Sequence, residues 1–296
     1  MALTLAEAAK LSNDVVLQGV VETVVKESPI LDRLPFIELV GNSLKYNRES
    51  TQGGAAFYAV GDAWTEGTPT FTQVSTGLTI LGGDADVDRY LASTRNNVQD
   101  LEAAVIQLKA RDVAQAFEQA FVTGDSSLDP KQFDGLNTLL LGARTTSMGV
   151  NGASLTLAKL DELVDLVRPG RPDLLLLSKR TRRSLMGLVR GAGSAFLETH
   201  RDDLGRYVEY WNGIPLAVSD FVGDAETVGT STDCSSVYAL QLGEGRLAGL
   251  QGPGGLQVER VGELETKDAV RWRVKWYVGL ALFSELSCAR LNGVRP

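Results

Sequence analysis

The sequence has little of the side-chain chemistry on which most active sites depend. It contains one histidine, His200, and two cysteines, Cys234 and Cys288, among 296 residues. A serine-type triad needs a base beside its nucleophile, and a helical zinc site usually needs two histidines. The cysteines are far apart and give neither a metal-ligand spacing nor a disulfide framework, so we predict that both are buried as small hydrophobes. We predict that His200 lies in a surface loop.

Other absences narrow the class further. No apolar run is long enough to cross a membrane, and the N-terminus lacks the basic and apolar regions of a secretory signal. The net charge is −8, which does not favour a strongly basic face for nucleic acid. The glycine-rich segments 191–194 and 243–245 match neither a P-loop nor a dinucleotide-binding loop. We therefore expect a soluble protein of the reducing cytoplasm that uses no cofactor, no metal and no membrane.

The clearest helical pattern runs from Asn96 to Gly124. Asn96 or Asn97 is expected to cap its first turn, and Gly124 to end it in the left-handed conformation. The helix is expected to be roughly 40 Å long and to pack its apolar face on C-terminal strands between residues 256 and 282. The apolar residues recur at spacings of three to five, and they are Val98, Leu101, Val105, Leu108, Val113, Phe117 and Phe121.

Residues 41–92 have the pattern of a long β-hairpin. Polar and apolar residues alternate over 43–49 and again over 73–80, with turn-rich sequence between them. A ribbon of this kind is marginally stable alone in water, so it needs a partner surface, for which we expect another copy of the chain. Trp64, at the tip, is either an anchor in a partner's pocket or packed locally within the tip.

The remainder of the chain alternates between helix and strand patterns, which indicates an α/β subdomain. The glycine-rich segment 243–255 is predicted to be a surface loop. The two C-terminal strands, 256–261 and 269–282, are expected to pair around a turn, with Val270, Trp272, Val274 and Trp276 on one face and Arg271, Arg273, Lys275 and Tyr277 on the other. The α/β elements are predicted as helices over 155–167 and after Ser178, and strands over 173–177, 207–209, 214–218 and 236–242.

Three charged clusters allow alternative interpretations. The acidic strand 84–88 is either a solvated face or a calcium-like site. The second alternative is less favoured, because the glutamate that a calcium-binding loop has at its twelfth position is missing. The basic cluster 179–183 is either a solvated, salt-bridged surface or a contact to nucleic acid or a neighbouring subunit. The basic strand face of Arg271, Arg273 and Lys275 meets an acidic neighbour or lines an interior that holds DNA, where salt would weaken the contact.

The order of these parts resembles that of tailed-bacteriophage major capsid proteins, the Hong Kong 97-type fold. The resemblance covers nearly the whole chain, and it depends on the order of family-like turns and not on any catalytic motif. Its most specific pieces are Phe133-Asp134-Gly135-Leu136 after the long helix, residues 210–216 with Ser219-Asp220, and the closing strand that enters Val278-Gly279-Leu280-Ala281.

The resemblance implies an α+β fold with an N-terminal arm, an extended β-hairpin loop, a peripheral domain with a long spine helix, and an α/β axial domain. The expected divisions are 1–40 for the arm, 41–92 for the extended loop, 93–136 for the peripheral domain with its spine helix, 137–255 for the axial domain, and 256–296 for the peripheral return strands and C-terminus.

The implied function is that of a non-enzymatic major capsid protein, which self-assembles as hexamers and pentamers into an icosahedral shell around a double-stranded DNA phage genome. The expected location is the virion, after assembly in the host cytoplasm. Scaffolding and portal proteins are expected partners, a decoration protein is a further one, and packaged DNA would be contacted weakly and non-specifically. The chain begins at Met1 and leads almost directly into the arm, so a separate scaffolding protein, or none, is expected. Lys45 and Asn47 lie in the hairpin, but nothing in the sequence assigns them the covalent crosslink that some members make.

Two other functions stay open from the sequence. One is an encapsulin-like compartment, which has a related fold and holds enzymes. The other is a cytoplasmic hydrolase or transferase built on the α/β part, for which we find no catalytic set. The residues predicted to lie at assembly interfaces are Lys45, Arg48, Trp64, Phe71, Arg180 and Arg183.

Overall fold

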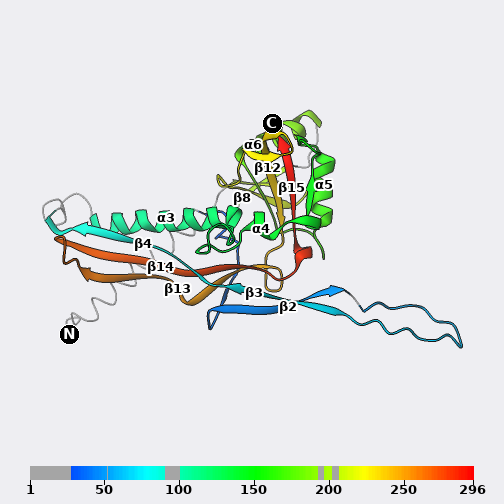
Figure 1. Cartoon of the computed structure of the whole chain (residues 1–296). Helices are drawn as coiled ribbons and strands as arrows, with labels where there is room; N and C mark the ends of the chain where they lie inside the picture. The colour runs from blue at the N-terminus through cyan, green and yellow to red at the C-terminus, as the bar shows by residue number, and fades with distance from the viewer. Residues whose placement is uncertain (1–27, 52, 91–100, 193–196, 202–206) are drawn as a thin grey trace.

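The computed structural model describes residues 28–51, 53–90, 101–192, 197–201 and 207–296. The predicted caps at Asn96 or Asn97, and most of the N-terminal arm, lie outside these ranges. The described chain forms an elongated body, an α/β part set at one end of that body, and a ribbon that projects away from both (Figure 1).

The elongated body is a long helix over a sheet. Helix α3 (Leu101–Thr123) covers one face of a sheet with the strand order β1 (Phe36–Glu38), β13 (Leu247–Glu263), β14 (Ala269–Leu282) and β4 (Thr79–Asp88). Strand β14 pairs antiparallel with both β13 and β4. The predicted alternation on β14 is confirmed: Val270, Trp272, Val274 and Trp276 are buried.

The apolar face of α3 packs on this sheet as predicted, but one residue of the predicted face lies on another side of the helix. Phe117 is fully buried and its ring lies 5.1 Å from that of Trp276 on β14. Leu108, which was expected on the buried face, is 57 % exposed, and Ile106 is buried in its place. A strict 3.6-residue period explains the difference, because Leu108 lies five residues before Val113 and therefore on another face of the helix.

Gly124 ends the helix for a different reason from the one predicted. Several described glycines have a positive φ, but Gly124 does not. A Cβ atom at this position would instead lie 2.3 Å from the carbonyl oxygen of Phe133. Glycine is therefore required by the close approach of the 133–135 segment and not by a left-handed turn.

The hairpin is shorter than predicted. Strand β2 (Ser43–Thr51) pairs with β3 (Thr70–Gly77), with Tyr46 opposite Val74. Residues 79–88, which the pattern assigned to the same hairpin, form β4 and join the sheet beside β14. The alternating pattern continues through both strands, so the sequence does not mark the change of partner at Gly77–Thr79.

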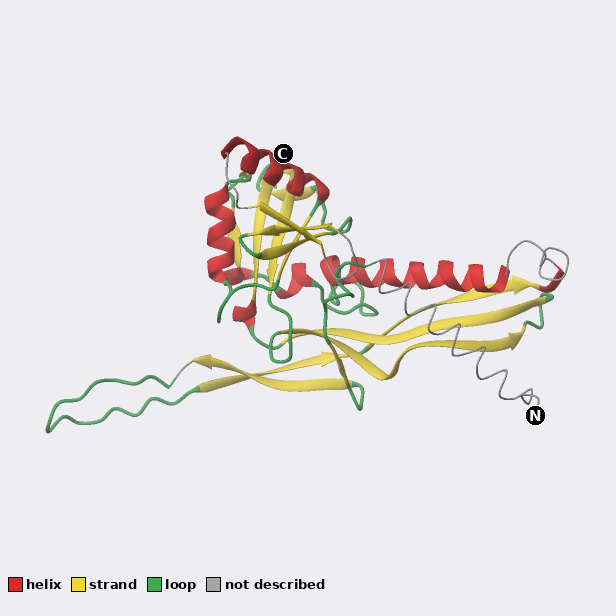
Figure 2. Cartoon of the chain, turned by 180° about the vertical axis from the view of Figure 1, so that it is seen from behind, coloured by secondary structure: helices red, strands yellow, loops and turns green. Residues whose placement is uncertain are grey.

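The α/β part is built on a second sheet. Its strand order is β5 (Thr145–Ser147), β15 (Cys288–Arg295), β12 (Ser231–Leu240), β7 (Leu174–Leu177), β10 (Ile214–Val218), β9 (Tyr207–Trp211) and β8 (Leu197–Arg201). Short strands β11 (Glu226–Val228) and β6 (Ala153–Ser154) pair with β12 and β15. Figure 2 shows this sheet with its helices at one end of the elongated body.

Helices α5 (Leu157–Leu166) and α6 (Lys179–Ala192) cover one face of that sheet, through Leu160, Leu163, Leu185 and Val189. The predicted cap of α6 is confirmed, since the amide of Thr181 donates to Ser178 Oγ at 3.2 Å. Shorter helical turns are α4 (Leu136–Leu139), η1 (Gly142–Arg144) and η2 (Glu285–Ser287).

Three further expectations differ from the structure. The predicted loop 243–255 is wrong from Leu247 onward, because β13 begins there and absorbs the glycines in an irregular register between Gln251 and Leu256. The C-terminal strand β15 pairs with β12, so residues 288–295 lie in the α/β part and not with the return strands β13 and β14. His200 lies in strand β8 and not in a loop.

Candidate assembly surface

The tip of the ribbon presents large apolar side chains to solvent. Phe57 and Val60 are fully exposed and Trp64 is 81 % exposed, while Phe71, on the paired strand β3, is 65 % exposed. The tip nevertheless has local order: the rings of Tyr58 and Trp64 stack at 4.3 Å, and the amide of Asp62 donates to the carbonyl of Ala59 at 3.2 Å. Both interpretations of Trp64 therefore have an observation behind them, since it packs locally and still offers one face outward.

Hydrogen bonds across the tip support this order. Tyr58 Oη lies 3.0 Å from Thr65 Oγ1 and accepts from the amide of Thr65 at 3.2 Å. These bonds lower the pKa of the Tyr58 hydroxyl. The tip is thus locally ordered, and its apolar side chains Phe57 and Val60 are fully exposed.

The base of the ribbon is fastened to the body by Tyr46 and Arg48. Tyr46 Oη donates to the carbonyl of Leu282 at 2.9 Å, and its ring lies 4.8 Å from that of Phe283. Arg48 Nε donates to the carbonyl of Phe283 at 3.2 Å, its Nη1 lies 2.7 Å from Glu285 Oε1, and its Nη2 donates to the carbonyl of Leu282. Arg48, predicted at an interface, therefore contacts its own chain, while Lys45 on the same strand is exposed.

Sequence reasoning missed the residues on the other side of this contact. Phe283 and Glu285 stand in a short connection with no motif, and more than two hundred residues separate them from Arg48. A cavity of about 580 Å³ lies beside the contact, between the ribbon and residues 283–286, with Arg144 on its wall.

The basic cluster 179–183 is mostly committed to partners within the chain. Lys179 pairs with Asp220 at 2.6 Å, and Arg182 binds both carboxylate oxygens of Glu209 at 2.6 Å. Within the described residues, Arg183 is exposed and has no ion pair. The salt-bridged alternative therefore describes most of the cluster, and Arg183 is its free cation in this part of the chain.

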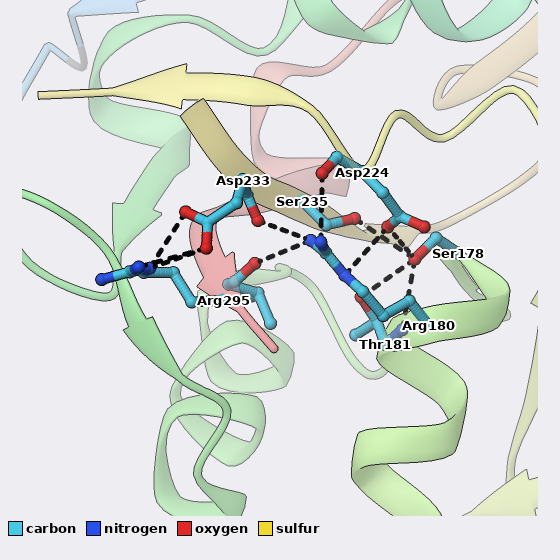
Figure 3. A network of polar contacts seen from close by, with 8 residues as sticks. Ser178, Arg180, Thr181, Asp224, Asp233, Ser235 and Arg295 are labelled. Carbon is cyan, nitrogen blue, oxygen red and sulfur yellow. Dashed lines mark hydrogen bonds and ion pairs between the residues drawn. The ribbon is translucent and has the colours of Figure 1, made fainter. Parts of the chain in front are cut away.

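Arg180 is the centre of a polar network at the start of α6 (Figure 3). Its guanidinium donates to the carbonyls of Asp224 at 3.1 Å and of Asp233 at 2.8 Å, and its Nε lies 3.4 Å from Asp224 Oδ1. Ser178 Oγ donates to the same carboxylate at 2.6 Å. Arg295 pairs with Asp233 at 3.0 Å, which lowers the pKa of Asp233. Because Arg180 of α6 and Arg295 of β15 both bind Asp233 of β12, this network connects α6 to the C-terminal strand.

The acidic and basic strands predicted as separate features are one ladder of ion pairs. Arg273 Nε lies 2.6 Å from Asp84 Oδ1, and Arg271 Nε lies 2.6 Å from Asp86 Oδ1. Hydrogen bonds from these arginines lower the pKa values of both aspartates. Lys275 pairs with Glu259 on the other side of β14. The acidic neighbour of the basic strand face is thus a strand of the same chain.

The residues that the structure describes lack a metal-ligand cluster and a membrane-spanning helix. They contain no group of three or more metal-ligating side chains, and none of their helices is long and apolar enough to span a bilayer. Both cysteines are buried, as predicted, and burial raises the pKa of the Cys288 thiol to about 11. The side chain of His200 lies outside the described residues.

Comparison with known proteins identifies the family. The profile of the phage capsid family matches residues 11–208, about two thirds of the 296 residues. The chain belongs to the phage capsid family. It is a shell-forming capsid protein with a Hong Kong 97-like fold. A search of curated proteins finds no match.

Several solved structures share the fold at low sequence identity. The holo-SrpI encapsulin complex of Synechococcus elongatus PCC 7942 matches with a TM-score of 0.72 and 18 % identity, over 100 % of this chain and 97 % of that one. A structure from Microbacterium phage Oxtober96 gives 0.66 and 16 %, over 91 % of both chains. The capsid of a native GTA particle gives 0.64 and 15 %, over 92 % of this chain and 90 % of that one. The likeness extends over almost the whole length of each subunit.

Proposed function

We propose that this capsid protein assembles as hexamers and pentamers into an icosahedral shell that encloses a double-stranded DNA phage genome, and that it has no enzymatic activity. The observation that carries the proposal is the ribbon. It extends from the body with Phe57, Val60 and Trp64 exposed, and a ribbon of this kind is at best marginally stable alone in water. A neighbouring copy supplies the missing surface.

Four of the residues predicted to lie at assembly interfaces are exposed, and we assign the contacts between copies to them. Lys45, Trp64 and Phe71 lie on the ribbon and Arg183 on α6, so each is available to a second copy. Arg48 and Arg180 act from inside the subunit, by holding the ribbon and α6 in place. Many modest contacts of this kind, repeated by symmetry, close a shell.

Contact with packaged DNA is weak and non-specific in this proposal. The net charge is −8, and the arginines of β14 are already paired with aspartates of β4. A shell with such a surface holds its genome by enclosure. Scaffolding and portal proteins, with a decoration protein as a further partner, complete a virion assembled in the host cytoplasm.

Deletion of Thr51–Thr70 tests the proposal. We expect the shortened chain to stay soluble, with the circular dichroism of the folded α/β part, and to form no shells under conditions in which the full chain does. Electron microscopy and size-exclusion chromatography read the result. Normal shells from the shortened chain would defeat the proposal, and a full chain that remains monomeric or dimeric under all conditions would defeat it equally.

A second candidate is a protein compartment of the encapsulin type. The structure of an encapsulin complex matches every residue of this chain with a TM-score of 0.72, which is the observation in its favour. The contents of purified shells distinguish the two functions. Nuclease-resistant double-stranded DNA favours the capsid, and a stoichiometric cargo protein without DNA favours the compartment.

A further inference from the structure

The contact at the base of the ribbon lies at an unusual point in the fold. Leu282 ends β14 in the peripheral sheet, and the chain then passes through Phe283 and η2 into β15 of the axial sheet. Tyr46 and Arg48 bind the backbone of this crossover itself. The ribbon is therefore attached to the connection between the two sheets, and not to either sheet alone.

The crossover is itself held from both sides. The amide of Phe283 donates to the carbonyl of Arg246, and the amide of Arg168 donates to the carbonyl of Leu286, each at 2.8 Å. The Phe283 amide lies in the same peptide plane as the Leu282 carbonyl, so the first bond fixes the direction of one carbonyl that Arg48 binds, and the second holds the far end of the crossover. A planar fork with several donors fixes direction as well as distance, which a lysine cannot do.

Beyond this contact, the described part of the chain shows no hydrogen bond between the body and the outer part of the ribbon. In residues 49–51 and 53–72, as the structure describes them, the hydrogen bonds run only within the ribbon, such as Thr51 Oγ1 to Thr70 Oγ1 at 2.6 Å. At about 3.3 Å per residue, the segment from Arg48 to Asp62 spans up to roughly 45 Å. A tilt of about 10° at the base therefore moves the tip by about 8 Å.

We propose that Arg48 is a positioning residue: with Tyr46 it locks the angle of the ribbon to the crossover between the two sheets, and this angle sets the curvature of the shell. The first part concerns the single chain, and the second rests on the proposed shell function. Since the tip must reach the next subunit, an error in ribbon angle becomes an error in the position of every neighbour.

The angle is measured in the full-length chain before assembly. Ala63 at the tip and Gln115 on α3 are both exposed and are replaced by cysteine for spin labels, while the native cysteines are buried and do not react. Arg48→Ala should broaden the distance distribution and shift it by about 8 Å. Arg48→Lys should restore it only in part, because an ammonium is a compact point charge without the planar fork that reaches both carbonyls and the carboxylate in a fixed direction.

Controls and the assembled shell complete the test. Lys45→Ala, on the same strand and exposed, should leave the distribution unchanged. If Arg48→Ala fails to fold, Glu285→Gln removes the ion pair and leaves the carbonyl bonds, and it should broaden the distribution to a lesser extent. A distribution identical to that of the unsubstituted chain in Arg48→Ala or, if that variant does not fold, in Glu285→Gln would overturn the positioning role.

Electron microscopy then reads the second part. Shells of Arg48→Ala should vary in diameter or fail to close. Shells of unchanged, uniform diameter from a variant whose ribbon angle has changed would overturn the link to curvature. A chain that forms no shells without any substitution contradicts the proposed function, while the distance measurement still decides the role of Arg48.

Discussion

Gly135 donates its amide to the carbonyl of Gly124 at 2.9 Å, so the two glycines meet where the spine helix ends. A Cβ atom on Gly135 would lie 2.4 Å from the carbonyl oxygen of Ala120 and 2.8 Å from that of Phe121. This contact gives the Phe133–Leu136 turn its physical reason. The turn brings the chain back against the last turn of α3, and only a residue without a side chain fits there.

Gly135→Ala should therefore destabilise the fold. The clash is with backbone atoms of a helix, which cannot move independently, so we expect a loss of about 1–3 kcal/mol in the free energy of unfolding. Denaturant unfolding of the unassembled chain measures it. Gly187→Ala is the matched control: Gly187 lies inside α6 with nothing within 4 Å of the new methyl group, and it should gain about 0.5–1 kcal/mol. Equal stability of the two variants would contradict this account.

Glu118 should make stability depend on pH. This residue of α3 is buried, and burial raises the pKa of its carboxyl despite hydrogen bonds from Ser219 and Ser28, with Asp220 adding to the rise. Between the ordinary and the raised pKa, the folded chain holds a proton that the unfolded chain has lost. The contribution of Glu118 is therefore fully present below its ordinary pKa and is lost as pH rises through the folded pKa.

Glu118→Gln removes the loss of stability that ionisation of this carboxyl causes as pH rises. The variant should be more stable than the unsubstituted chain near pH 8 and equal to it near pH 4, as measured by urea unfolding at both values. Glu244→Gln, at an exposed position, controls for the change in net charge. A difference between Glu118→Gln and the unsubstituted chain that does not vary with pH would show that the carboxyl does not titrate as proposed.

The ladder on β4 and β14 predicts the opposite pH dependence. The hydrogen bond from Arg273 lowers the pKa of Asp84, so the contribution of Asp84 is present above its ordinary pKa and is lost as pH falls through the lower folded value. Asp84→Asn should cost stability near pH 7 and much less near pH 3. The loss should also shrink in high salt, because the pair is partly exposed. A loss that is the same at both pH values would mean that Asp84 acts through packing alone.

Trp64→Ala should separate assembly from folding. Because the side chain is 81 % exposed and packs only on Tyr58, unfolding of the single chain should not change. If Trp64 anchors in a neighbour, the concentration needed for assembly should rise more than about tenfold, as for an interface hot spot. Light scattering measures that concentration. Tyr58→Phe keeps the stacked ring and should assemble nearly normally, whereas normal assembly of Trp64→Ala would limit the tryptophan to local packing.

Local pattern was sufficient for the repeating elements. The alternation from Val270 to Trp276 and the spacing of Phe117 and Phe121 predicted a strand and a helix whose buried faces the structure confirms. These features follow from periods of two and 3.6 residues, which act within a few neighbours along the chain. The buried state of both cysteines followed from composition and spacing in the same way.

Which strands pair with one another could be seen only in the tertiary structure. The pattern through residues 73–88 is continuous, yet Val74 pairs with Tyr46 in the ribbon whereas Asp84 pairs with Arg273 in the body. Likewise, nothing near Arg48 in the sequence indicates that it binds the carbonyls of the 282–283 crossover. Which strands lie side by side depends on burying surfaces contributed by segments far apart in the chain. The sequence alone therefore determined that this chain has a ribbon, a spine helix and a charged sheet. The tertiary structure decided that the charges of the sheet pair with one another and that the base of the ribbon binds the 282–283 crossover.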